Sequence, residues 1–222
     1  MIQTDSLQLT HQSLGFFSHK TKDRILISSL ILFNEGGFNN VTTASIAKHT
    51  GILEGTLWYH FNSKKDILSN HIQLLQKLFL SVNQQNKSKD FEKIISEFFQ
   101  SYNIIWDFRY ILRDNFQKTF EGDESILKSI TEINNYLDKW AENRILHSFD
   151  SGLIKIDSKE TENLSEIILV IGRYWLDFSM KKYPSIGINS LRLKGLKHII
   201  TILNPYLNTQ GIPIIRNMLK QY

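Results

Sequence analysis

The chain has 222 residues, enough for one large domain or for a small head plus a larger body, and its 41% hydrophobic and 12% aromatic residues allow a substantial core. The net charge of +4 makes the chain only mildly basic, so binding to a nucleic acid would require positive charges concentrated on one part of the surface. Cysteine is absent, which excludes disulfides, thiolate nucleophiles and cysteine-ligated metals. The polar start lacks a secretory apolar segment, and no uncharged apolar run approaches the roughly 18 residues of a membrane span, so we expect a soluble, cytoplasmic protein.

The first predicted elements are an arm and a helix. Residues 1–20 are polar and show no sustained period, so we expect a flexible N-terminal arm, either without a role or touching DNA. From Ile25 to Phe33, apolar residues recur at spacings of three and four, which predicts a first helix over 23–35. The pair Gly36-Gly37 ends it, because glycine accepts the left-handed conformation at a helix terminus.

The next two predicted helices, over 44–49 and 54–60, have the spacing of a helix-turn-helix. Ala47 is small where one helix must pass close to the other, and four residues later Gly51 can adopt the positive φ of a sharp turn. Six residues further on, Leu57 can dock the second helix onto the first. Thr42 and Thr43 are both candidate N-caps for the helix that precedes the turn.

The remainder of the chain predicts long helices without strands. Ser63 can cap a fourth helix, and the polar stretch 81–90 is the best linker candidate. Four amphipathic segments follow, over 90–118, 123–150, 160–182 and 188–207, and the first of them has a candidate bend at Trp106-Asp107. The tail after Pro205 is left unassigned. Together these segments predict an all-α fold with three short helices before a larger helical body.

The head resembles the DNA-binding domain of TetR-family transcriptional regulators. The family's pattern is met over residues 22–68 by Ile25-Leu26, Leu32-Phe33, Gly37-Phe38, Thr42-Thr43, Ile46-Ala47, Gly51, Gly55-Thr56-Leu57, Phe61 and Ser63-Lys64. Two residues depart from it: Trp58 stands in the place of a tyrosine, and Glu54 stands where small or neutral polar residues are common. The resemblance implies an N-terminal helix-turn-helix DNA-binding domain over 21–66 and a helical effector-binding and dimerisation domain over 67–222.

The recognition helix of such a domain lies in the major groove of double-stranded DNA with its N-terminal residues at base edges. The predicted DNA-binding residues are Thr43, Glu54, Gly55, Thr56, Trp58, Tyr59, His60 and Lys64. Thr43, Tyr59, His60 and Lys64 are the phosphate candidates, by resemblance and by their places at helix ends. Three roles stay open. Glu54 either accepts from the N4 amino group of cytosine or only suits the first helical turn, and Trp58 and Tyr59 each contact either DNA or the core.

The resemblance also implies that the body dimerises and holds a small-molecule pocket. The predicted homodimer interface comprises Ile167, Ile171, Tyr174, Trp175, Phe178, Leu196, Ile200 and Leu203, with burial inside one subunit as the alternative. The predicted effector pocket comprises Phe99, Tyr102, Trp106, Tyr110, Phe120, Tyr136 and Trp140. Such an aromatic lining favours a small hydrophobic or aromatic effector.

Enzymatic function is not predicted. The chain contains no P-loop, G-x-S-x-G or H-E-x-x-H motif, so we expect no catalytic residues, no metal and no cofactor. The resemblance favours a repressor that binds a palindromic operator as a dimer and is released by its effector. The alternative is an architectural or partner-binding protein with the same DNA-binding head and no effector.

Overall fold

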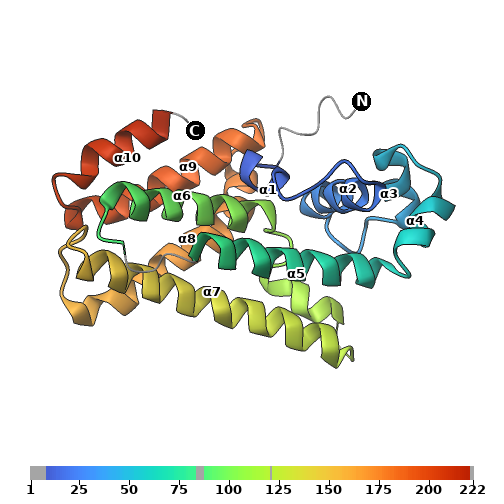
Figure 1. Ribbon diagram of the computed structural model, residues 1–222, viewed down its shortest axis with the longest axis horizontal. Coiled ribbons are helices and arrows are strands. Elements are labelled where there is room, and N and C mark those ends of the chain that lie inside the picture. Colours follow the sequence, from blue (N-terminus) through green and yellow to red (C-terminus); the bar gives the residue numbers. More distant parts are fainter. Residues whose placement is uncertain (1–8, 84–87, 121, 221–222) are drawn as a thin grey trace. The chain divides into compact units, whose positions relative to one another are not determined.

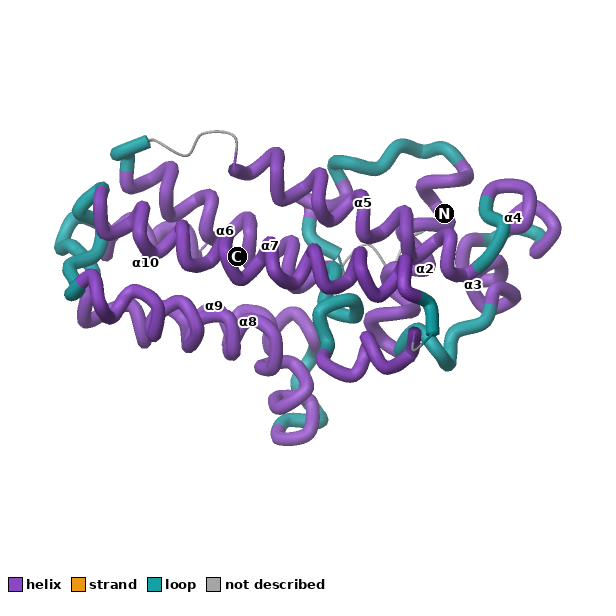
Figure 2. Tube along the Cα trace, turned by 90° about the horizontal axis from the view of Figure 1, so that it is seen from below, coloured by secondary structure: helices purple, strands orange, loops and turns teal. Residues whose placement is uncertain are grey.

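The computed structural model describes residues 9–83, 88–120 and 122–220. Within these ranges all regular elements are helices, and the extended backbone contributes one isolated antiparallel bridge, between Ile154 and Leu207 (Figure 2). This confirms the predicted all-α fold class. In the same ranges, no helix combines the length and the apolar character that crossing a membrane requires. The chain divides into two compact units, unit 1 (Met1–Phe79 with Asn103–Ile133) and unit 2 (Leu80–Tyr102 with Asn134–Tyr222).

Three helices of unit 1 form the predicted helix-turn-helix head. They are α2 (Thr21–Gly36), α3 (Thr43–Thr50) and α4 (Glu54–His60), which pack together in Figure 1 and are followed by α5 (Lys64–Asn83). Each begins and ends within two residues of its predicted bounds. Unit 1 extends beyond the predicted domain of residues 21–66, because it also contains the first part of α5 and residues 103–133.

Local sequence signals set the ends of these helices. Thr42 is the N-cap of α3: its hydroxyl accepts from the Ser45 amide at 3.1 Å, and the Ser45 hydroxyl accepts from the Thr42 amide in return. Gly51 ends α3 in the left-handed conformation at φ 73°, ψ 40°. Ala47 and Leu57 are both buried, as the close packing of the two helices requires.

The segment before α2 differs from the expected arm. Leu9 and Thr10 are buried, and α1 (His11–Leu14) follows them. The Thr10 amide lies 3.1 Å from both carboxylate oxygens of Asp107, and the Thr10 hydroxyl donates to one of them at 2.5 Å. A fully buried carboxylate must be hydrogen-bonded, and this contact orders the chain around Thr10. The expected arm's residues 1–8 lie outside the described residues.

Residues after Asp107 complete the core of unit 1. Helix α6 (Phe91–Asp107) ends there, at the predicted bend, and a 3-10 helix, η2 (Asp114–Phe120), follows. Asn34 of α2 joins this turn, because its amide nitrogen donates to the Asp107 carbonyl at 2.7 Å and its oxygen accepts from the Tyr110 amide at 3.1 Å. Phe33, Phe38, Tyr110, Phe116 and Phe120 pack beside it with ring centroids 5.0 to 5.8 Å apart.

His71 of α5 lies fully buried in the same unit. Its Nε2 donates to the Leu26 carbonyl at 3.0 Å, so Nδ1 accepts from the Tyr110 hydroxyl at 2.7 Å in the neutral ring. Burial disfavours the charged imidazolium and lowers the pKa of His71 to about 4, against a smaller opposing effect of the Leu26 hydrogen bond. Burial likewise raises the pKa of the Tyr110 phenol.

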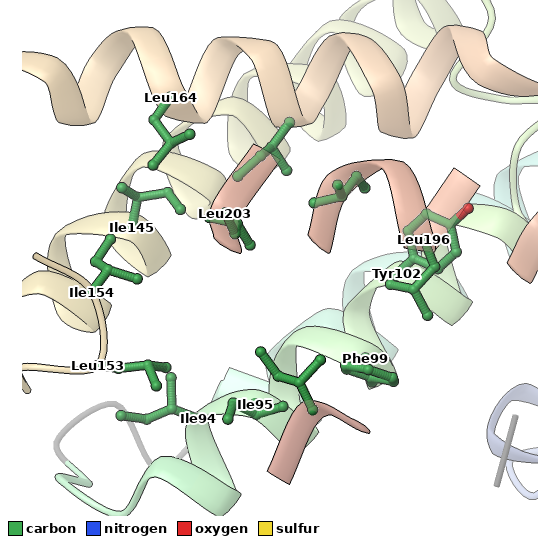
Figure 3. Packing of buried hydrophobic residues seen from close by; sticks show 13 residues of the cluster. Ile94, Ile95, Phe99, Tyr102, Ile145, Leu153, Ile154, Leu164, Leu196 and Leu203 are labelled. Atoms are coloured by element: carbon green, nitrogen blue, oxygen red, sulfur yellow. The ribbon is translucent and has the colours of Figure 1, made fainter. Parts of the chain in front are cut away.

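Unit 2 contains the helices of the predicted body. Its later elements are α7 (Glu124–Asp150, from Asn134 onward), η3 (Ser158–Glu160), α8 (Thr161–Lys182), α9 (Ile188–Leu203), η4 (Asn204–Tyr206) and α10 (Gly211–Lys220). Helices α8 and α9 run side by side (Figures 1 and 2). Figure 3 shows the core between them and α6, where Ile95, Phe99, Ile145, Leu196 and Leu203 belong to one buried cluster.

The tail that the sequence leaves unassigned forms α10. Pro213 is its third residue, a position where the missing amide hydrogen breaks no helical hydrogen bond. Ile215 anchors the helix in the unit 2 core. Gly211 and Pro213 both lie in the first turn of the helix.

Candidate functional site

Helix α4 presents one face to solvent and keeps the other in the core. Leu57 is fully buried, and Phe61, which directly follows the helix, is 1% exposed, whereas Tyr59 is 85% exposed and Trp58 is 44% exposed. Glu54 and the other residues of the first turn are also open to solvent or half-buried. The short helix is therefore anchored from the inside by one leucine and offers its outer face to a partner.

Glu54 is held in place by the predicted phosphate candidate Thr43. The Thr43 hydroxyl donates to the Glu54 Oε1 atom at 2.7 Å, which joins the first residues of α3 and α4. While this bond is made, the Thr43 hydrogen is not available to a phosphate oxygen, which can only accept. The second carboxylate oxygen of the exposed Glu54 remains as an acceptor, the chemistry that recognises the amino group of cytosine.

Gly55, Tyr59 and His60 shape the rest of this surface. A Cβ atom added to Gly55 would meet no heavy atom within 4 Å, so a partner can approach the backbone of the first turn closely. The rings of Tyr59 and His60 meet edge to face with centroids 5.2 Å apart. Thr56 is half-buried at the inner edge of this surface.

Lys64 has a structural role that its sequence position does not reveal. Its ammonium donates to the Phe38 carbonyl at 2.7 Å and to the Val41 carbonyl at 2.9 Å, and lies 4.4 Å from the centre of the Phe38 ring. Partial burial lowers its pKa. Lys64 therefore fixes the loop between α2 and α3 and keeps one of its three protons for a phosphate. Its neighbour Lys65 pairs with Asp123 at 2.6 Å.

Unit 2 contains a small, almost wholly apolar hollow of about 50 Å³. It is lined by Ile94, Ile95, Phe98, Phe99, Arg144, Ile145, Ser148, Leu153, Ile154, Ile200, Leu203, Leu207 and Ile215, several of which appear in Figure 3. Among the seven residues of the predicted effector pocket, Phe99 alone belongs to this lining. The main polar feature of its wall is Arg144, which forms a buried ion pair with Glu97.

The other predicted pocket residues serve different parts of the two units. In unit 2, the buried Tyr102 donates from its hydroxyl to the Arg192 carbonyl at 2.8 Å, Tyr136 is 36% exposed and Trp140 is half-buried. The other three predicted pocket residues, Trp106, Tyr110 and Phe120, are buried in unit 1. The structure therefore does not gather the seven aromatic residues around this hollow.

An apolar stripe runs along the exposed side of α8. Ile167 is 46% exposed, Val170 56%, Tyr174 37% and Phe178 55%. Steps of three and four residues place these side chains on one face of the helix. Val170 belongs to this face by the same spacing. A face of this kind on a water-soluble helix is typical of a protein interface.

The remaining predicted interface residues lie further inside. Leu196 is fully buried and Leu203 is 8% exposed, both in the core of unit 2, so the alternative of burial inside one subunit applies to them. Ile171 and Trp175 are partly buried on α8, and Ile200 is partly buried in the lining of the hollow. Trp175 donates from its indole nitrogen to the Leu191 carbonyl at 2.7 Å, which fixes α8 against α9.

Two family profiles match the chain. One, described as bacterial regulatory proteins of the tetR family, matches residues 25–70, and the other, described as TetR, bacterial transcriptional repressor, matches residues 67–213. The chain belongs to the TetR family. It is accordingly a DNA-binding transcriptional regulator and not an enzyme, as the sequence predicted.

Relatives of known function are similar over nearly their whole length. The chain is 25% identical over 193 residues to the biofilm operon icaADBC HTH-type negative transcriptional regulator IcaR of Staphylococcus aureus (strain Newman), covering 84% of this chain and 98% of IcaR. IcaR of Staphylococcus epidermidis is 24% identical over 189 residues with the same coverage. A solved TetR-family regulator from Marinobacter aquaeolei VT8 shares the fold at a TM-score of 0.70 and 24% identity, over 91% of this chain and 98% of that one.

Two further exposed residues lie on α3 and directly before α4, and neither was among the predicted DNA-binding residues. Lys48 is exposed on α3, one turn after the exposed Ala44. Leu53, directly before α4, is 81% exposed. The helical spacing from Ala44 could have placed Lys48 on the outer face, whereas the apolar Leu53 gave no sequence signal of exposure.

Proposed function

We propose that the protein is a repressor that binds a palindromic operator as a homodimer and leaves it when a small apolar effector binds. The observation that carries the proposal is the outward face of α4, where Tyr59 is 85% exposed beside the exposed Glu54. A recognition helix needs such a face to reach base edges in the major groove. The relative IcaR is described as a negative transcriptional regulator, which supports repression.

The homodimer is proposed because one head has few free cations. Lys64 and Lys65 are engaged within the protein, which leaves Lys20, Lys22 and Lys48 as the other exposed lysines on the helices of the head and at their ends. Two heads double the phosphate contacts and add a spacing requirement between half-sites. The stripe of Ile167, Val170, Tyr174 and Phe178 on α8 is the surface that we propose for the second copy.

The effector is proposed to enter the apolar hollow of unit 2. A drug-sized ligand needs about 300–1,000 Å³, so a hollow of about 50 Å³ must open before such a ligand fits. A ligand that binds only the opened state shifts the protein toward that state. Two solved proteins of the same fold are complexes with a ligand, SmeT with triclosan and Bacillus subtilis FadR with stearoyl-CoA, and both ligands have large apolar parts.

Genomic footprinting of the purified full-length protein tests the proposed function. We expect a few palindromic sites near promoters, because a regulator acts where transcription starts. Many dispersed sites without a shared palindrome would instead support the architectural alternative. Failure to protect any DNA would contradict both.

Tyr59→Ala is expected to weaken binding to the recovered operator by at least about tenfold, because each dimer loses two contacts worth about 1 kcal/mol or more. Tyr59 is 85% exposed, so the variant should unfold at the same urea concentration as the unmodified protein. Fluorescence anisotropy with the operator duplex measures the affinity. Leu80→Ala, which truncates a side chain 56% exposed on α5, is the matched control. Equal affinities for Tyr59→Ala and Leu80→Ala would contradict the contact.

Leu207→Trp tests the effector site. Leu207 is half-buried at the wall of the hollow, so a larger ring there should fill it while operator affinity stays unchanged. We expect a compound that raises the melting temperature and releases DNA from the unmodified protein to lose both effects on the variant. A compound that still releases the variant from DNA would place the effector elsewhere.

A further inference from the structure

The side chain of Leu53 neither caps a helix nor packs in the core. It is the N-cap of α4, at φ −72° and ψ 146°, and its side chain makes no capping hydrogen bond. Its carbonyl accepts from the Thr56 amide at 3.0 Å and from the Leu57 amide at 3.3 Å, so the backbone there is fixed. The side chain is 81% exposed, so it contributes little to the core.

The choice of leucine here works against local stability. Serine, threonine, aspartate and asparagine stabilise a helix from the N-cap, because their side chains accept from the free amides of the first turn, whereas leucine cannot. Thr42 shows the favoured arrangement one helix earlier, where its hydroxyl accepts from the Ser45 amide. A residue that breaks a local rule without a gain in packing is expected at a functional position.

The neighbours of Leu53 indicate what covers it. It lies directly before Glu54, whose carboxylate is held by Thr43, and two residues before Gly55, where the backbone is open to close approach. These residues belong to the face that the proposed function places in the major groove. The one apolar group that DNA offers there is the C5-methyl group of thymine.

We propose that Leu53 is a specificity-determining residue that contacts the C5-methyl group of a thymine in each operator half-site. The inference rests on the proposed function, and it adds the base that this residue reads. The leucine gains apolar burial against the methyl group, and a polar N-cap would not. The thymine lies next to the base that Glu54 faces, because the two residues are adjacent at the start of one helix.

The test uses the full-length protein and operator duplexes selected from a random double-stranded DNA pool. Each thymine of the selected half-site is replaced in turn, in both halves, by deoxyuridine, which lacks only the methyl group. Burial of one methyl group is worth about fourfold in affinity, so one such replacement is expected to weaken binding about fifteenfold over two half-sites. The remaining replacements should leave the affinity unchanged.

Substitutions of Leu53, by serine and by alanine, complete a double-mutant cycle with the deoxyuridine replacements. Both variants should bind the thymine and deoxyuridine duplexes equally well, and Leu53→Ser should unfold at a higher urea concentration because serine restores a cap. If the unmodified protein binds every deoxyuridine duplex as tightly as the thymine duplex, or the selected half-site contains no thymine, the inference is overturned while the proposed function stands. If no duplex is selected at all, the proposed function fails with it.

Discussion

Replacing both Val170 and Phe178 with glutamate is expected to convert the proposed homodimer to a monomer and to lower the operator affinity at least about a hundredfold. The two side chains are 56% and 55% exposed on one face of α8, so the substitution leaves the core of the subunit in place. The substitution would bring four carboxylates into one proposed apolar interface, where burying their charges is unfavourable. Losing the second head removes a gain of about 10²–10⁴ in apparent affinity.

Light scattering gives the oligomeric state of this double variant, and operator binding in the same buffer gives the affinity. Lys139→Glu is the matched control, because it adds a carboxylate to an exposed position on α7 in the same unit. Circular dichroism should show equal helix content in all three proteins. A double variant that stays dimeric and keeps its affinity would show that the second copy binds another surface.

Lowering the pH from 7 to 4 is expected to remove about 3 kcal/mol of stability through His71 alone. The neutral ring is buried in unit 1, and the pKa of His71 in the folded protein is about 4, against about 6.5 in an unfolded chain. Between these values the unfolded state binds a proton that the folded state does not. The stability is therefore fully present above pH 6.5, falls as the pH decreases, and is lost once the pH is below 4.

Urea unfolding at several pH values measures this loss, with His71→Gln as the test variant. Glutamine can keep hydrogen bonds to the Leu26 carbonyl and the Tyr110 hydroxyl without titrating in this range. We expect the variant to lose about 3 kcal/mol less than the unmodified protein between pH 6.5 and 4. His19→Gln, at an exposed histidine, should behave like the unmodified protein. Parallel curves for His71→Gln and the unmodified protein would contradict the assignment.

The head could be predicted closely because its helix ends depend on neighbouring residues. Thr42 caps α3 through a residue three positions away, and Gly51 turns the chain through its own φ angle. Such short-range signals can be recognised from the sequence alone. The contact of Thr10 with Asp107 spans 97 positions, and no local pattern announces it. The prediction of a flexible arm over residues 1–20 therefore did not anticipate the buried segment around Leu9.

The body could be predicted as helices, but its faces could not be assigned. Leu196 and Val170 are both aliphatic residues on amphipathic helices, yet one is fully buried and the other 56% exposed. Periodicity gives the position of a face but does not tell which neighbour covers it. The aromatic residues of the expected pocket show the same limit, since Tyr110 and Phe99 pack in separate units.

The buried pair of Thr10 and Asp107 has a practical meaning for anyone shortening this protein. Cutting the chain just ahead of α2, as its polar start invites, would remove the Thr10 amide and hydroxyl, which both donate to an enclosed carboxylate. Expression designs should therefore keep Leu9 and everything after it, with purification tags attached upstream. Poor folding of a shortened protein would reflect the loss of the Thr10–Asp107 contact and would give no information about DNA recognition.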